Sequence, residues 1–88
     1  MSKIKKDLNF LKESARVRTI NSTLSANILA FRKKKGFSQS ELAQQLGVTF
    51  QAVSKWETAR SAPDISLLPR MAEIFDCSID ELLKNEQA

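Results

Sequence analysis

The turn at Gly47 limits how this chain can fold more than any other feature of the sequence. Before it, Ser38 is followed three residues later by Glu, the capping-box spacing, which predicts a helix over 39–46. After it, Thr49 predicts the N-cap of a second helix over 50–57. Because glycine adopts the left-handed backbone conformation without a steric penalty, Gly47 suits a tight turn between them. The stretch therefore predicts two short helices joined by a tight turn.

Apolar spacing predicts how the two helices pack. Ala43 is small where the helices must approach each other closely. The apolar side chains that we expect to point inward are Leu42, Leu46, Val48, Val53 and Trp56. The opposite face of the second helix is then left exposed to solvent.

Helical spacing continues on both sides of this pair. Upstream, a break at 19–23 is rich in cap-forming residues, and a helix follows from Leu24 to Gly36, where cations in the last turn and a glycine mark its end. The inward side chains expected in this helix are Leu24, Ile28 and Phe31.

Downstream of the pair, a polar loop over 58–63 precedes a further helical pattern that starts at Asp64. Since proline is tolerated only in the first turn, Pro69 predicts that the regular helix begins near Ser66, after a loose turn. Its expected inward side chains are Ile65, Leu68, Met71, Ala72 and Phe75. A second capping box at Ser78 opens a final helix that ends near residue 84. Without strand alternation anywhere, the sequence predicts an all-α fold.

Composition excludes several classes of function. The chain has 88 residues, no His and one Cys, so it offers no disulfide framework, zinc-finger spacing or His-based catalysis. We therefore expect one small domain without a sensor domain, which is not an enzyme and has no catalytic residues, cofactor or metal. With neither an apolar run of membrane-spanning length nor an apolar signal core, a cytoplasmic location is expected.

Charge is distributed unevenly along the chain. Residues 1–36 carry ten basic and two acidic side chains, whereas residues 37–88 carry four basic and eight acidic ones, so a net +8 and a net −4 make up the overall +4. A basic half attached to an acidic half indicates an anionic partner that is approached from one side. Nucleic acid is the first candidate and a membrane surface the second.

The first 22 residues form a basic segment with an apolar stripe. Its members are spaced as on one face of a helix, with Phe10 off the stripe: Ile4, Leu8, Leu11 and Ala15. Three interpretations remain open: a basic arm that adds phosphate contacts, an amphipathic helix that packs on its own domain or on a second subunit, and disorder.

Three stretches resemble the phage-repressor/Cro-type helix-turn-helix family, also called the XRE family. They are Phe37–Ala43, Val48–Glu57 and Ile74–Leu83. The resemblance covers residues 24–83 and implies a compact five-helix, lambda-repressor-like domain that binds operator DNA, usually as a dimer. We therefore expect a DNA-binding domain over 23–84, with 1–22 and 85–88 outside it.

The resemblance and the chemistry of the side chains imply a reading face on the 50–57 helix. Gln51 can bond adenine N6 and N7, and Lys55 can donate to guanine O6 and N7. Phe50 either covers a thymine methyl group or folds back on the edge of the domain. Backbone contacts are expected from Gln39, at the N-terminus of its helix, and from Thr49, Thr58 and Arg60.

Two further sets follow from the resemblance alone. The family pairs Arg32 with Glu57, which ties the first helix of the domain to the end of the reading helix. The family-like dimer surface comprises Phe75, Ile79, Leu82 and Leu83. The alternative place for most of this apolar area is the core.

We expect the protein to be a sequence-specific regulator of transcription that binds double-stranded operator DNA as a homodimer. Among such regulators, a repressor is expected. The two copies would read half-sites about 34 Å apart, which is one turn of the duplex. The alternative is an antitoxin or a protein-interaction adaptor on the same fold, with a toxin or an anti-repressor as protein partner. No membrane partner is expected. A set of polar side chains on one face, with Gln51 and Lys55 among them, favours DNA.

Overall fold

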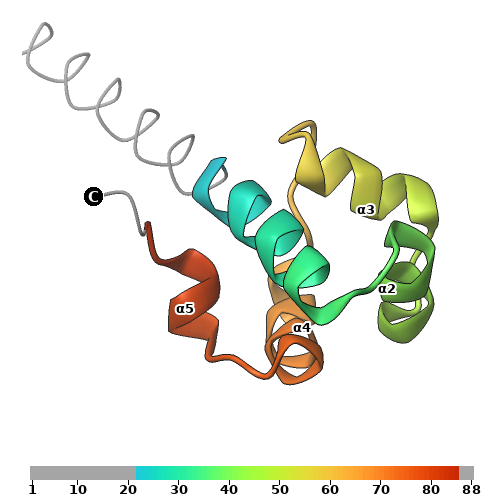
Figure 1. Cartoon of the computed structure of the whole chain (residues 1–88). Helices are drawn as coiled ribbons and strands as arrows, with labels where there is room; N and C mark the ends of the chain where they lie inside the picture. Colours follow the sequence, from blue (N-terminus) through green and yellow to red (C-terminus); the bar gives the residue numbers. More distant parts are fainter. Residues whose placement is uncertain (1–21, 86–88) are drawn as a thin grey trace, which may run out of the picture.

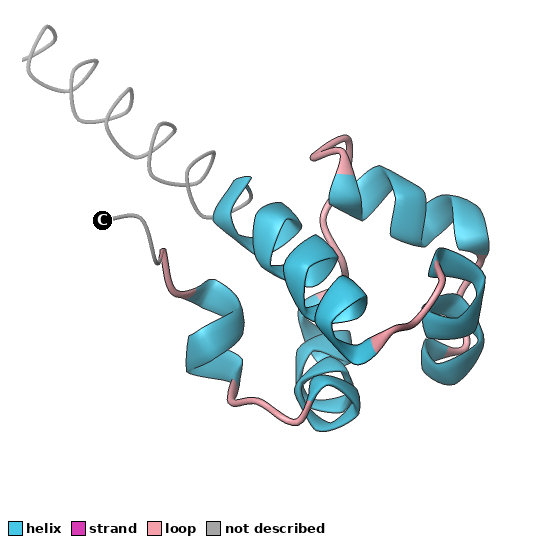
Figure 2. Ribbon diagram, in the orientation of Figure 1, coloured by secondary structure: helices cyan, strands magenta, loops and turns pink. Residues whose placement is uncertain are grey.

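The computed structural model describes residues 22–85, and within them the chain is all-helical, as predicted. A helix over residues 22–35 is followed by α2 (Gln39–Leu46), α3 (Phe50–Glu57), a 3-10 turn (Ile65–Leu67), α4 (Leu68–Phe75) and α5 (Ile79–Leu83) (Figures 1 and 2). None of the helices in this part of the chain has the length and apolar character needed to cross a membrane. Residues 1–21, for which three interpretations were open, and the tail at 86–88 lie outside the described residues.

Local capping accounts for where α2 and α3 begin. The Ser38 hydroxyl oxygen accepts a hydrogen bond from the Glu41 N–H at 3.0 Å, while the Ser38 N–H donates to the Glu41 carboxylate at 3.0 Å. Thr49 Oγ1 accepts from the Ala52 N–H at 3.1 Å. Gly47 between the helices has a φ of 71°, in the left-handed region that favours glycine. The predicted helix bounds 39–46 and 50–57 are confirmed.

A single apolar core joins the described helices. Its largest fully buried side chains come from all of them: Phe75, Ile28, Leu42, Met71, Leu82 and Val53. Phe31 stacks on Phe75 with ring centroids 5.7 Å apart. Trp56, from α3, is also buried. The same core that closes the domain therefore fixes which face of α3 points outward.

Side-chain hydrogen bonds attach α5 to the 22–35 helix. The Asn27 Nδ2 group donates to the carbonyl oxygens of Leu82 at 2.7 Å and Lys84 at 2.9 Å, and so occupies acceptors that the end of α5 leaves unpaired. Figure 1 shows α5 and the α2–α3 pair at opposite sides of the 22–35 helix. The C-terminal helix thus lies far from the two-helix motif.

Three expectations about local structure were wrong. Residues 22 and 23, expected in a break, are already helical. The regular helix α4 begins at Leu68 rather than near Ser66, because a 3-10 turn comes first, with Asp64 accepting from the Ser66 N–H at 3.0 Å. Ile65, expected inward, is 80% exposed, since the tighter 3-10 turn does not keep the phase of the α-helical stripe.

A charged network connects three helices. Arg32 makes two hydrogen bonds to the Glu57 carboxylate, Nε to Oε2 at 2.6 Å and Nη2 to Oε1 at 3.0 Å, and its Nη1 donates to the Phe37 carbonyl at 2.8 Å. Gln39 Nε2 also donates to Glu57 Oε1, at 2.8 Å. The Arg32 and Glu57 side chains are only 12% and 3% exposed. Hydrogen bonding to Glu57 raises the pKa of the Arg32 guanidinium above its ordinary value, and burial opposes that rise only in part.

We predict that Glu57→Ala lowers the free energy of unfolding by about 3 kcal/mol, because it leaves the Arg32 charge buried without its partner. Urea denaturation followed by circular dichroism measures this. The matched control is Glu73→Ala, which removes an exposed ion pair with Arg70 and should cost less than about 0.5 kcal/mol. Adding Arg32→Met to Glu57→Ala should recover part of the loss. Equal losses for Glu57→Ala and Glu73→Ala would contradict the structural role of the pair.

Candidate nucleic-acid interface

The outward face of α3 is polar except at its first residue. Gln51 and Lys55 are exposed, and Phe50 is 47% exposed, so the ring has not folded back fully onto the domain. On the opposite face, Val53 and Trp56 are buried. The structure therefore brings the three predicted base-contact residues together on one accessible surface of one helix.

The hydroxyl groups at the two ends of α3 already have partners. Thr49 Oγ1 accepts from the Ala52 N–H, whereas Thr58 Oγ1 donates to the carbonyls of Ser54 at 3.0 Å and Lys55 at 3.3 Å. Both threonines are exposed. Since a hydroxyl has a single hydrogen, Thr58 would have to release its internal bonds before it could donate to a phosphate. In the structure, Thr58 is the C-cap residue of α3.

The loop after α3 reverses on a left-handed residue that is not glycine. Ala59 has a φ of 60°, and the Arg60 N–H donates to the Lys55 carbonyl at 2.9 Å. An alanine in this conformation is strained, because Cβ approaches the following carbonyl oxygen. The sequence predicts a polar loop over 58–63 but does not indicate that Ala59 adopts this conformation. The turn leaves Arg60 exposed just beyond the end of α3.

Gln39 is the first residue of α2, where the helix has backbone N–H groups without intrahelical partners. Its side chain is half-buried and is oriented by the bond to Glu57, the last residue of α3. One amide hydrogen remains for a second acceptor. The bond between Gln39 and Glu57 was missed from the sequence, because nothing in the spacing of the two residues indicates that helix ends 18 positions apart meet.

Two of the four residues of the expected dimer surface lie in the core, which is the alternative position that the sequence left open for them. Phe75 and Leu82 are 1% and 0% exposed, so their side chains fill the core and have no area to offer a partner. Ile79 and Leu83 are 37% and 39% exposed. Of the four predicted residues, Ile79 and Leu83, both on α5, remain accessible for contact with another chain.

Comparison with known proteins gives one family. The helix-turn-helix family model matches residues 28–82. The HTH-type transcriptional activator BcrR of Enterococcus faecalis is 39% identical over 56 residues, which is 64% of this chain and 28% of BcrR. The chain also spans only about half the length of two Bacillus subtilis regulators that it matches.

Two solved structures have a similar fold. A hypothetical transcription factor, NHTF, from Neisseria is similar with a TM-score of 0.71 and 34% identity, over 77% of this chain and 78% of that one. The P22 c2 repressor, crystallised with a synthetic operator, gives a TM-score of 0.65 and 34% identity, over 69% of this chain and 92% of that one. With the family model matched across the described core, this chain belongs to the helix-turn-helix family, in its phage-repressor/Cro (XRE) type.

Proposed function

We propose that this protein is a sequence-specific regulator of transcription that binds double-stranded DNA with α3 in the major groove. The observation that carries the proposal is the two-sided character of α3. Val53 and Trp56 fix the helix to the core, while Gln51 and Lys55 lie exposed on its outer side. An α-helix fits the major groove, where each base pair presents a distinct pattern of donors and acceptors.

The exposed residues of α3 differ in the base that each one can recognise. The Gln51 amide has a donor and an acceptor side by side, which match adenine N6 and N7, and Lys55 is a donor for guanine O6 and N7. Phe50 offers an apolar surface that suits the thymine 5-methyl group. Gln51 and Lys55 are four residues apart and therefore share one stripe of the helix, so they can reach neighbouring base pairs.

Contacts to the DNA backbone are proposed around this reading face. The N-terminus of α2 presents N–H groups and the positive end of the helix dipole, and the oriented Gln39 amide lies at that point. Arg60 supplies an exposed cation beyond the other end of α3. Thr49 and Thr58 complete the proposed set, with the hydroxyl of Thr58 rearranging on contact. Such contacts set position on the duplex, not sequence preference.

The regulatory mode that we propose is repression by a homodimer, in the cytoplasm and without enzymatic activity. Likeness to the P22 c2 repressor in both sequence and structure favours repression. A dimer that uses Ile79 and Leu83 would present two copies of α3 to half-sites one helical turn apart. An antitoxin or adaptor function has no comparable observation in its favour.

We predict that DNA affinity falls steeply with salt. If a dimer neutralises about seven phosphates, a plot of the logarithm of the association constant against the logarithm of the salt concentration should have a slope of about −6. Fluorescence anisotropy with a labelled duplex between roughly 50 and 200 mM KCl measures the slope. A slope close to zero would contradict binding to the phosphate backbone.

We predict that Gln51→Ala weakens binding to the preferred duplex by about 1–3 kcal/mol and relaxes selectivity at one base position, because a two-point contact with adenine is lost. Binding to the preferred and to random duplexes is compared by anisotropy. Gln45→Ala, at an exposed position of α2, is the matched control and should change little. An equal loss on both duplexes would make Gln51 a backbone contact instead.

We predict that Phe50 makes the protein sensitive to thymine methyl groups. Replacing thymine by uracil at the contacted positions should cost the unaltered protein about 0.8 kcal/mol for each methyl group removed from the contact. The same replacement should cost Phe50→Ala almost nothing, since the apolar partner is gone. If both proteins lose the same affinity, Phe50 does not cover the methyl group.

A further inference from the structure

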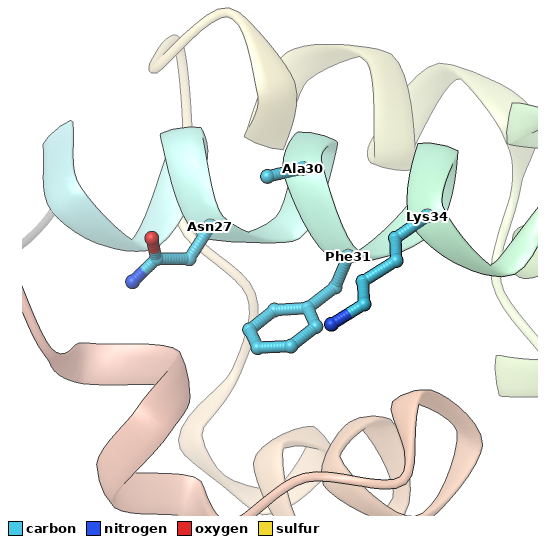
Figure 3. A pocket seen from close by; sticks show the side chains of 4 residues that line it. All are labelled: Asn27, Ala30, Phe31 and Lys34. Atoms are coloured by element: carbon cyan, nitrogen blue, oxygen red, sulfur yellow. The ribbon is translucent and has the colours of Figure 1, made fainter. Parts of the chain in front are cut away.

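Phe50 is the only aromatic ring that lies exposed among the described residues. It is the first residue of α3 and is 47% exposed. Figure 3 shows the Phe31 ring pointing from the 22–35 helix toward α4, where it stacks on Phe75. The other rings in this part of the chain lie in the core or pack against it: Phe31, Phe37, Trp56 and Phe75. Of these rings, Phe50 alone can therefore contact a bound molecule without a rearrangement of the core.

The surroundings of Phe50 on α3 are polar. Gln51 and Lys55 are exposed, and Ser54, one helical turn after Phe50, is half-buried. Within α3, all of whose residues are described, no other large apolar side chain is exposed. A protein interface has an apolar centre made of several side chains, and this face of α3 has only one. The partner that fits the ring is therefore a small apolar group that lies among hydrogen-bonding groups.

The backbone around Phe50 is held in one conformation. The preceding residue, Thr49, caps α3, and its Oγ1 accepts from the Ala52 N–H at 3.1 Å. About half of the Phe50 surface is covered by the protein. A side chain that is already partly ordered loses less conformational entropy when it binds. The first turn of a recognition helix is also the part that contacts base edges in helix-turn-helix complexes.

We propose that Phe50 makes the protein sensitive to cytosine methylation, with 5-methylcytosine in the major groove as its ligand. This inference rests on the proposed entry of α3 into that groove. The apolar group on the base edges there is the 5-methyl group of thymine. Unmodified cytosine has only a hydrogen at C5, whereas 5-methylcytosine carries a methyl group at the same ring carbon as thymine. A ring that covers the thymine methyl group therefore also covers that of 5-methylcytosine.

The chemistry of the Phe50 side chain explains why the methyl group is the feature that it detects. Thymine and cytosine differ at ring position 4, where one presents an acceptor and the other a donor. A phenylalanine ring has neither a donor nor an acceptor, so it does not distinguish these two groups. Methylation of a cytosine that faces Phe50 buries one more apolar group and raises the affinity for that site.

The test compares duplexes that differ by one methyl group. Each base pair of one half-site of the preferred sequence is replaced in turn by cytosine–guanine, with and without the 5-methyl group, and binding is followed by anisotropy. At the position that faces Phe50, the unaltered protein should bind the methylated duplex about fourfold more tightly. Phe50→Ala should bind both duplexes alike, and Phe50→Leu, which keeps an apolar side chain, should retain part of the difference.

The matched control is Ile65→Ala. Ile65 is 80% exposed and lies outside α3, so its loss should leave the preference for the methylated duplex unchanged. The proposal is overturned if the unaltered protein binds the two duplexes alike at every position, or if Phe50→Ala keeps the preference. Either result leaves the proposed function standing as long as the protein still distinguishes its preferred sequence from random DNA. Equal affinity for all sequences would contradict the proposed function itself.

Discussion

The carboxylate of Glu57 is the point on which the geometry of the two-helix motif depends. It accepts two hydrogen bonds from Arg32 and one from Gln39, and so joins the first described helix, the start of α2 and the end of α3. Because the Arg32 and Glu57 side chains are almost fully buried, each charge is stable there only while the other is present. The apolar core fixes which face of α3 points outward, and the two-point pair with Arg32 adds a defined geometry at the end of the helix. The same carboxylate orients the Gln39 amide at the α2 N-terminus, which links the stability of the fold to the surface proposed for DNA.

Much of the fold could be predicted because it is encoded locally. Ser38, Gly47 and Thr49 set the bounds of α2 and α3 through hydrogen bonds within a few residues, and the apolar spacing identified Val53 and Trp56 as inward-facing. The prediction was wrong where local chemistry competes with the helical pattern. Ile65 continues an α-helical stripe in sequence, but Asp64 caps a 3-10 turn there and Ile65 faces solvent.

The candidate site was less predictable, because it depends on contacts between distant positions. The exposed face of α3 follows directly from the helical period, so Gln51 and Lys55 could be placed from the sequence. Which apolar residues of α5 are buried could not: Leu82 and Leu83 are neighbours, yet only Leu82 reaches the core. The sequence also does not indicate that the Asn27 side chain donates a hydrogen bond to the end of α5. Nor does it indicate that the Thr58 hydroxyl donates to a backbone carbonyl of its own helix.

Reading of DNA bases by α3 is the central claim, and selection of bound sequences from a random duplex library tests it most directly. The purified full-length chain should enrich one motif, and two related half-sites with centres about 10 base pairs apart are expected for a dimer on one face of the duplex. Under the same conditions, Gln51→Ala should enrich a motif that has lost one base preference. A library that stays random after repeated selection with the unaltered protein would contradict the account.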